Sequence, residues 1–177
     1  MQKIIMLIGP PGAGKSYIAN SPENPNSLES QGYKIFSSDK YREKLLDDVN
    51  NQRKNGFVYG VMHRDLIDSI HKGYNVVYDA CNTKRRDRKT FFKIIEKNIK
   101  EDVEIIGIVF NISIEKCKEQ NAKRDRNVPE YVIDRMFSQL TMYPPSIDEG
   151  FSKIYTSEEW LETSNRIVKN DIDFDTK

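Results

Sequence analysis

The chain has 177 residues, 37% of them hydrophobic, and this length fits a single domain with one substantial core. Its 28 Lys and Arg are balanced by 27 Asp and Glu, so the net charge is only +1. This balance excludes the overall basic excess of a protein with a large nucleic-acid-binding surface, and any site for a polyanion must be a local cluster.

Short β-rich segments alternate with longer amphipathic segments along the chain, a pattern typical of βαβ units around a parallel sheet. The predicted strands are Lys3–Ile8, Tyr33–Ser37, Asn75–Tyr78, Val103–Phe110 and Lys153–Thr156. The predicted helices are Gly14–Asn20, Lys40–Val49, Phe57–His71, Arg85–Ile99, Ile114–Ala122 and Glu130–Met142. We expect an α/β fold with a mostly parallel five-stranded sheet and helices on both of its faces.

The pattern predicts one domain over residues 1–156. Residues 157–177 are expected to form a C-terminal extension, with a helix over 157–166 followed by a frayed acidic tail.

Nothing in the sequence predicts a membrane segment or a redox site. The N-terminal apolar run is about six residues long, too short for a signal peptide or a membrane span. Cys81 and Cys117 lack the spacing of a zinc or disulfide motif. We therefore expect a soluble protein of the cytoplasm.

The segment Gly9–Ser16, GPPGAGKS, matches the phosphate-binding pattern GxxxxGK[ST] between a predicted strand and a predicted helix. Its glycines allow backbone N–H groups to point at a polyphosphate. Lys15 is predicted to reach the β- and γ-phosphates, and the Ser16 hydroxyl is predicted to bind Mg²⁺. The fold should therefore be the three-layer sandwich of P-loop NTPases. ATPases, GTPases and nucleotide-gated switches share this site, so the motif alone does not establish catalysis.

An acid and an arginine follow the second predicted strand. Asp39 should lie at the carboxyl edge of the sheet, and Arg42 lies one helical turn beyond it. A carboxylate that orients a hydroxyl, beside a guanidinium that holds a phosphate, suits an acceptor that carries its own phosphate. The alternative is that Asp39 only caps the helix.

A second acid ends the third predicted strand. Asp79 is placed to hold a Mg²⁺-bound water or to meet the acceptor, although a plain turn residue is the alternative. The following helix carries a dense basic run, which either contacts phosphate or forms a solvated face. The run comprises Lys84, Arg85, Arg86, Arg88 and Lys89.

Closely spaced cations lie at residues 120–129, around the connection between the last two predicted helices of the domain. Such a segment is typical of a helical lid that closes over phosphates, in which Arg124 or Arg126 would stabilise the transferring group. A charged surface connection is the alternative.

Four segments together resemble the kinase domain of phage-type polynucleotide 5′-hydroxyl kinases, members of the P-loop kinase superfamily. They are GPPGAGKS, SSDKYR, YDACNT and NAKRDRNVPEYVIDRM, and the resemblance covers residues 2–156. It implies transfer of the γ-phosphate of ATP, with Mg²⁺, to the 5′-hydroxyl end of RNA or DNA.

The resemblance also implies roles for individual residues. Asp39 would be the general base, Arg42 would contact the acceptor phosphate, and Arg124 would be the lid arginine that contacts ATP. The catalytic set is then Asp39, Lys15 and Arg124, and the predicted metal ligands are Ser16 and Asp79. ATP-binding residues are Gly12, Ala13, Gly14, Lys15, Ser16, Tyr17, Arg124 and Arg126; acceptor-binding residues are Arg42, Asp79, Arg86 and Arg88.

Many members of that family carry an attached 3′-phosphatase or ligase domain, for which this chain has no room. We therefore expect it to act alone or beside separate ligase or phosphatase enzymes. Two other functions stay open from the sequence. One is a P-loop kinase for a nucleoside, sugar nucleotide or antibiotic, and the other is an ATP-binding protein that transfers nothing.

Overall fold

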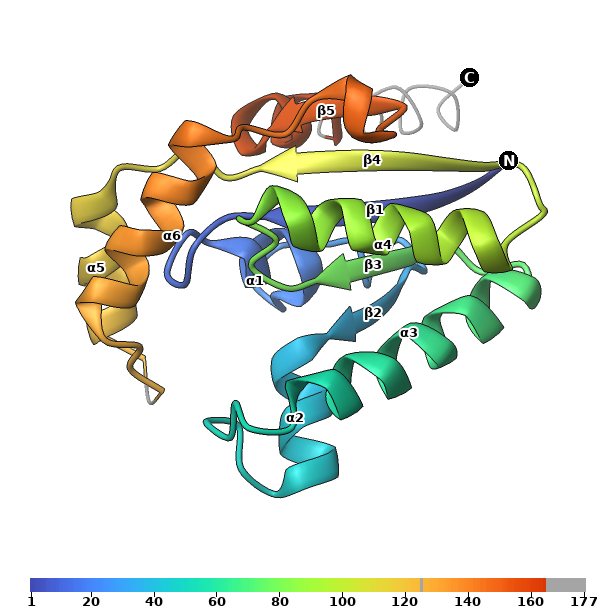
Figure 1. Ribbon diagram of the computed structural model, residues 1–177. Coiled ribbons are helices and arrows are strands. Elements are labelled where there is room, and N and C mark those ends of the chain that lie inside the picture. The colour runs from blue at the N-terminus through green and yellow to red at the C-terminus, as the bar shows by residue number, and fades with distance from the viewer. Residues whose placement is uncertain (125, 165–177) are drawn as a thin grey trace.

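The computed structural model describes residues 1–124 and 126–164, and Figure 1 shows a sheet with helices packed on both faces. The strands are β1 (Gln2–Ile8), β2 (Lys34–Ser37), β3 (Val76–Asp79), β4 (Val103–Val109) and β5 (Lys153–Thr156). They are ordered β2-β3-β1-β4-β5, and every neighbouring pair is parallel. The predicted α/β fold is confirmed, with all five strands parallel.

Strand β1 forms the centre of the sheet because its apolar residues run without interruption. Ile4, Met6 and Ile8 belong to the core on one face, whereas Ile5 and Leu7 belong to the core on the other. A strand with helices above and below it buries both sets of alternating side chains, so it has no polar face.

The helices divide between these two faces. They are α1 (Lys15–Asn20), α2 (Ser38–Leu46), α3 (Asn55–His71), α4 (Arg85–Asn98), α5 (Ile114–Ala122) and α6 (Glu130–Met142). Helices α3 and α4 fill one core, through residues such as Met62 and Phe91. Helices α1, α5 and α6 fill the other, through Ile18, Cys117 and Ile133. The result is the predicted three-layer sandwich.

The predicted elements are all present, with bounds shifted by at most three residues. Helix α2 ends at Leu46 rather than Val49, because Asp47 adopts a left-handed conformation (φ 53°) and its N–H bonds back to Glu43. A short 3₁₀ helix, η1 (Ile147–Glu149), was not predicted. The extension is helical over 157–164, and the predicted acidic tail lies outside the described residues. No helix in the described part of the chain is long and apolar enough to cross a membrane.

His63 of α3 lies within the aromatic part of the core. Its Nε2 is 3.0 Å from the hydroxyl of Tyr78, and its ring contacts those of Tyr59, Tyr78 and Phe91. Burial lowers the pKa of His63 to about 4, because the apolar surroundings disfavour the charged imidazolium.

This burial predicts a loss of stability in acid. The ordinary pKa of a histidine is about 6.5, so between pH 6.5 and 4 the unfolded chain binds the proton and the folded chain does not. The free energy of unfolding should then fall by up to about 1.4 kcal/mol per pH unit from this group as the pH decreases. His63→Gln should reduce this slope in urea denaturation measured across the interval. Parallel slopes for the two proteins would show that His63 is not buried in its neutral form.

Candidate active site

The parallel register brings three predicted site segments to one edge of the sheet. Leu7 pairs with Asp79, and Asp79 pairs with Ser37, at the carboxyl ends of β1, β3 and β2. The glycine loop continues from β1, and Asp39 follows two residues after Ser37. Residues separated by up to 70 positions therefore share one crevice, as is usual for ligand sites of open parallel sheets.

The glycine loop has the backbone that its sequence predicts. Gly12 and Gly14 adopt positive φ angles of 79° and 91°, a region that disfavours any residue with a Cβ. A Cβ at Gly12 would also overlap the backbone carbonyl oxygen of Cys117 on α5, whereas the space around Gly14 is open. The loop is thus packed closely against α5 on one side and accessible on the other.

Lys15 lies over this loop at the first position of α1. Its ammonium donates hydrogen bonds of 2.9 Å to the carbonyl oxygens of both Gly9 and Pro10. An ammonium has three N–H bonds, so one is left for a phosphate oxygen. Ser16 and Tyr17 follow on the exposed side of α1, and Ala13 is buried beneath the loop.

Asp39 lies in the first turn of α2 and is not its cap, because Ser37 occupies the cap position. Its side chain is 42% exposed. Two guanidinium groups contact its Oδ1: that of Arg42 at 2.8 Å and that of Arg126 at 2.5 Å. No hydrogen bond within the described residues reaches Oδ2, so this oxygen is the one that can accept a proton from a ligand.

Arg42 is the buried partner of Asp39. Its side chain is only 4% exposed, and its second terminal nitrogen donates to Asn55 Oδ1 at 3.0 Å. Its Nε is buried without a hydrogen-bond partner among the described residues. A buried guanidinium nitrogen without a hydrogen-bond partner is unusual in proteins. It makes Arg42 a candidate for a role beyond packing.

The predicted lid is formed by α5, α6 and the loop between them. Asn121, almost wholly buried, holds this loop by donating to Asn127 and Val128 and by accepting from the Val128 N–H. Arg126 of this loop contacts Asp39, and it also donates to Asn50 at 3.1 Å. Arg124 is exposed. The structure therefore brings Arg126, and not Arg124, to Asp39.

Asp79 lies between the glycine loop and Asp39. Burial raises the pKa of Asp79, whereas the nearby charge of Lys15 and a hydrogen bond from Ser37 lower it. No group of three His, Cys, Asp or Glu side chains forms a metal cage in the described ranges. A Mg²⁺ ion does not need one, because it is commonly held by one or two protein oxygens together with substrate phosphates. Ser16 and Asp79 supply oxygens of that kind.

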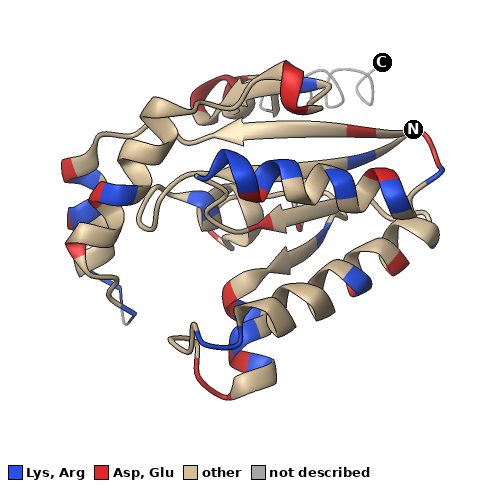
Figure 2. Ribbon diagram, in the orientation of Figure 1, with Lys and Arg blue, Asp and Glu red and all other residues tan. Residues whose placement is uncertain are grey.

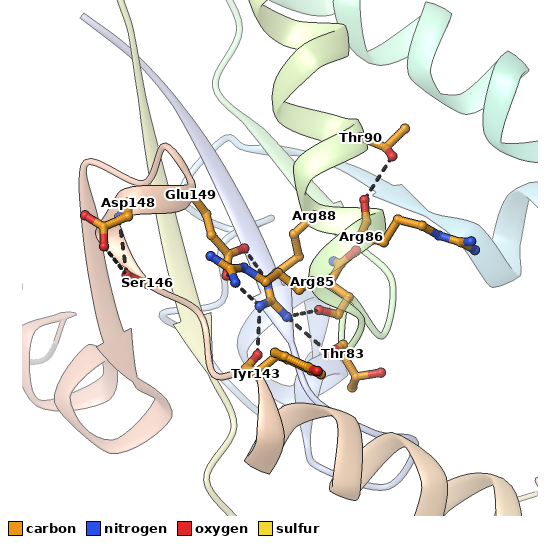
Figure 3. Close-up of polar contacts among 10 residues, drawn as sticks. Thr83, Arg85, Arg86, Arg88, Thr90, Tyr143, Ser146, Asp148 and Glu149 are labelled. Carbon is orange, nitrogen blue, oxygen red and sulfur yellow. Dashed lines mark hydrogen bonds and ion pairs between the residues drawn. The ribbon is translucent and has the colours of Figure 1, made fainter.

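Two predicted acceptor residues on α4 lie away from this crevice. The Arg86 side chain is 86% exposed and forms an ion pair of 3.7 Å with Asp87. The side chains of Arg88 and Glu149 have no exposed surface, and Figure 3 shows them pointing toward one another. Arg88 binds Glu149 through two hydrogen bonds of 2.7 Å and also donates to the carbonyl oxygens of Asn82, Thr83 and Tyr143.

The prediction that Arg88 contacts the acceptor is therefore wrong. Every donor of its guanidinium is satisfied by protein oxygens, and no ligand reaches it in the folded chain. Arg88 instead joins α4 to the end of α6 and to η1.

Several residues of the crevice were not predicted. Asn50 and Asn55, which bind the two arginines, lie in a polar stretch without a recognisable motif. Asn82 is buried with a left-handed backbone (φ 52°) and donates to the Leu7 carbonyl oxygen, which ties the third strand's loop to β1. The preference of Asn for that backbone region is the one signal that could have identified it.

A family model described as an AAA domain, AAA_33, matches residues 4–143. Among curated proteins, the transcription factor bHLH140 of Arabidopsis thaliana is 25% identical over 160 residues. That match covers 86% of this chain but 16% of the relative, so the chain spans about a sixth of the relative's length.

Solved structures of similar fold include several kinases. A putative kinase from Chloroflexus aurantiacus has a TM-score of 0.66 at 13% identity, covering 95% of both chains. A gluconokinase from Sinorhizobium meliloti has a TM-score of 0.55 at 14% identity, covering 99% of this chain and 98% of the other. A chain of the Pnkp1/Rnl/Hen1 complex has a TM-score of 0.54 at 19% identity, covering 72% of this chain and 40% of the other. At these identities the likeness shows the fold.

The buried pair predicts that Glu149→Gln strongly destabilises the protein. Removing one charge leaves Arg88 buried and uncompensated, which typically costs about 3–5 kcal/mol. Urea denaturation measures this loss. Glu119→Gln is the matched control, because Glu119 pairs with Lys123 on the exposed surface, where a salt bridge contributes about 0–1 kcal/mol. Equal, small effects of the two substitutions would contradict the structural role of Arg88.

Proposed function

The chain belongs to the AAA domain family and has the fold of P-loop kinases, and on that premise we propose that it transfers the γ-phosphate of ATP to the 5′-hydroxyl end of RNA or DNA. The observation that carries the proposal is Asp39. Its carboxylate is held by two arginines at the sheet edge where the glycine loop ends, and its Oδ2 is left for an acceptor hydroxyl.

The glycine loop fits the triphosphate of ATP. Gly12, Ala13 and Gly14 provide backbone N–H groups, Lys15 provides an ammonium, and the open side of the loop at Gly14 leaves room for phosphate. Mg²⁺ would be held by Ser16 and, directly or through water, by Asp79; when bound, it neutralises charge on the phosphate oxygens.

The transfer step follows from the positions of these groups. The acceptor oxygen forms a bond to the γ-phosphorus while the bond from that phosphorus to the β–γ bridging oxygen breaks. The proton of the acceptor hydroxyl passes to Asp39 Oδ2. Arg126 lies beside this carboxylate, where it can meet negative charge that develops on the transferring group. Arg42 is almost wholly buried, so it acts through Asp39, whose carboxylate it holds at 2.8 Å.

A nucleic-acid acceptor is supported by charge as well as by the resemblance of the motifs. Arg42, Arg126 and Lys15 bring three positive charges to the crevice, against the carboxylates of Asp39 and Asp79. A surplus of cations suits an acceptor that carries a phosphate of its own next to the reacting hydroxyl. Acting on strand ends, the protein would work beside separate ligase or phosphatase enzymes, and the similar fold in the Pnkp1/Rnl/Hen1 complex is compatible with such partners.

A small-molecule kinase is the second candidate. The gluconokinase is matched over 98% of its chain, whereas the chain of the Pnkp1 complex is matched over 40%. The small exposed surface of Arg42 also suits a compact acceptor.

The two candidates are separated by a transfer assay. The purified protein receives γ-labelled ATP and Mg²⁺ with 5′-hydroxyl RNA, 5′-hydroxyl DNA or gluconate, and Lys15→Ala serves as the control. We expect label on the oligonucleotide ends. Asp39→Asn should bind ATP normally but lose transfer by several orders of magnitude, and near-normal turnover would exclude Asp39 as the base. Label on gluconate alone would establish the second candidate.

The lid offers a matched pair of variants. Arg126→Ala should lower kcat by about 100- to 1,000-fold, because it removes a cation aimed at charge that develops in the transition state. Arg124→Ala should lower kcat by less than about tenfold, since an exposed lid cation contributes only general attraction. The kcat of both variants is measured by steady-state kinetics with the acceptor that the transfer assay identifies. The reverse order would return the role to Arg124, as the motif resemblance implies.

A further inference from the structure

A groove lies between α4 and the end of α6, outside the crevice described above. Its volume is about 540 Å³, and its walls are formed by residues of two segments, 84–93 and 139–143. The lining residues are Lys84, Arg85, Arg86, Lys89, Thr90, Lys93, Gln139 and Tyr143.

Five of these residues are cations and none is an acid. Arg85, Lys89 and Lys93 recur every four positions, so they form a stripe along one side of α4. Figure 2 shows several basic residues along this helix. Eight residues of helix rise by about 12 Å. Phosphates of one strand in a duplex are spaced by about 3.4 Å along the axis, so the stripe spans several of them.

The positive charge of this groove is poorly compensated. Arg85 and Arg86 each have one acidic neighbour at 3.7 Å, Glu149 and Asp87 respectively. Within the described residues, Lys84, Lys89 and Lys93 make no ion pair. In a chain of net charge +1, this concentration of free cations is a local site for an anion.

The groove also has a fixed aromatic wall. The Tyr143 side chain is 50% exposed, while its carbonyl oxygen accepts a hydrogen bond of 2.9 Å from the buried Arg88 (Figure 3). Gln139 is tied to Thr83 by a 3.1 Å hydrogen bond. The Tyr143 backbone and the Gln139 side chain are therefore anchored by partly buried hydrogen bonds. An exposed tyrosine ring beside a row of cations suits bases that stack while their phosphates bind.

The position of the groove relates it to the crevice. Lys84 lies five residues beyond Asp79, so the groove begins where β3 ends, at the same edge of the sheet. From the structure we propose that this groove binds the phosphodiester backbone of a nucleic-acid strand beyond its 5′-terminal nucleotide. This proposal rests on the proposed function, because the strand in the groove is the acceptor whose 5′ end reaches Asp39.

The test compares two double variants with the same change in charge. The double variant Lys89→Glu with Lys93→Glu reverses the charge of two lysines in the groove. The control is Lys3→Glu with Lys72→Glu, at the opposite end of the sheet, where β1 and β3 begin. All four lysines are exposed, and the folding of both variants is checked by urea denaturation, because Lys3→Glu stands opposite Glu104 of β4. Binding of fluorescent single-stranded RNA and DNA is measured by anisotropy against salt concentration.

We expect wild type and control to bind a strand equally, and the groove variant to bind at least tenfold more weakly at low salt. The slope of log affinity against log salt should decrease by about two in the groove variant, one for each lost phosphate contact. The relative affinities for RNA and DNA identify which strand the groove accepts. Equal loss in both variants, no binding by wild type, or binding only to anionic lipid vesicles would overturn the proposal.

Kinetics separate the groove from the transfer reaction. For wild type, a long 5′-hydroxyl oligonucleotide should have a lower KM than a nucleoside 3′-phosphate, which is too short to reach the groove. The groove variant should lose this difference while its kcat with the short acceptor stays at the wild-type value. An unchanged KM for the oligonucleotide would contradict the groove. Strand binding that depends on the groove without any labelled ends would instead contradict the proposed transfer reaction alone.

Discussion

The parallel alignment of β1, β2 and β3 is the constraint on which the rest of this site depends. A parallel pair must be joined by a crossover, so each strand ends at the same edge and each connection starts there. This is why the glycine loop, Asp39 and Asp79 meet although they are far apart in sequence. The apolar run of β1 secures the alignment, because a strand with no polar face is stable only in the middle of a covered sheet.

Two buried arginines illustrate how burial gives similar side chains different roles. Arg88 is paired with Glu149 and has every donor satisfied, so it fixes the positions of α4, α6 and η1 and exposes nothing to a ligand. Arg42 is paired with Asp39, which is partly exposed, and it retains a donor without a partner. A buried arginine with every donor hydrogen-bonded has a structural role. A buried arginine that keeps one unpaired donor and contacts an exposed carboxylate is part of the crevice.

The predicted lid is held by a buried amide and by ion pairs of Lys118 on α5 with Glu130 and Asp134 on α6. Asn121 uses both its donors and its acceptor to hold Asn127 and Val128, which follow Arg126 in the loop after α5. The packing of Gly12 against α5 places the same helix beside the phosphate loop, so the lid and the loop share a common support.

The order of the elements, the phosphate loop and the two acids near strand ends could be predicted from sequence alone, because they follow from hydrophobic periodicity, glycine spacing and the geometry of parallel strands. The roles of the cations were decided only by tertiary structure. Arg88 was expected at the surface with its basic neighbours, yet the distant Glu149 compensates its charge and makes its burial possible. Arg126 contacts Asp39, whereas the resemblance of the motifs assigned the phosphate contact of the lid to Arg124. A cation's role depends on which oxygens surround it, and those oxygens come from segments that the local sequence does not specify.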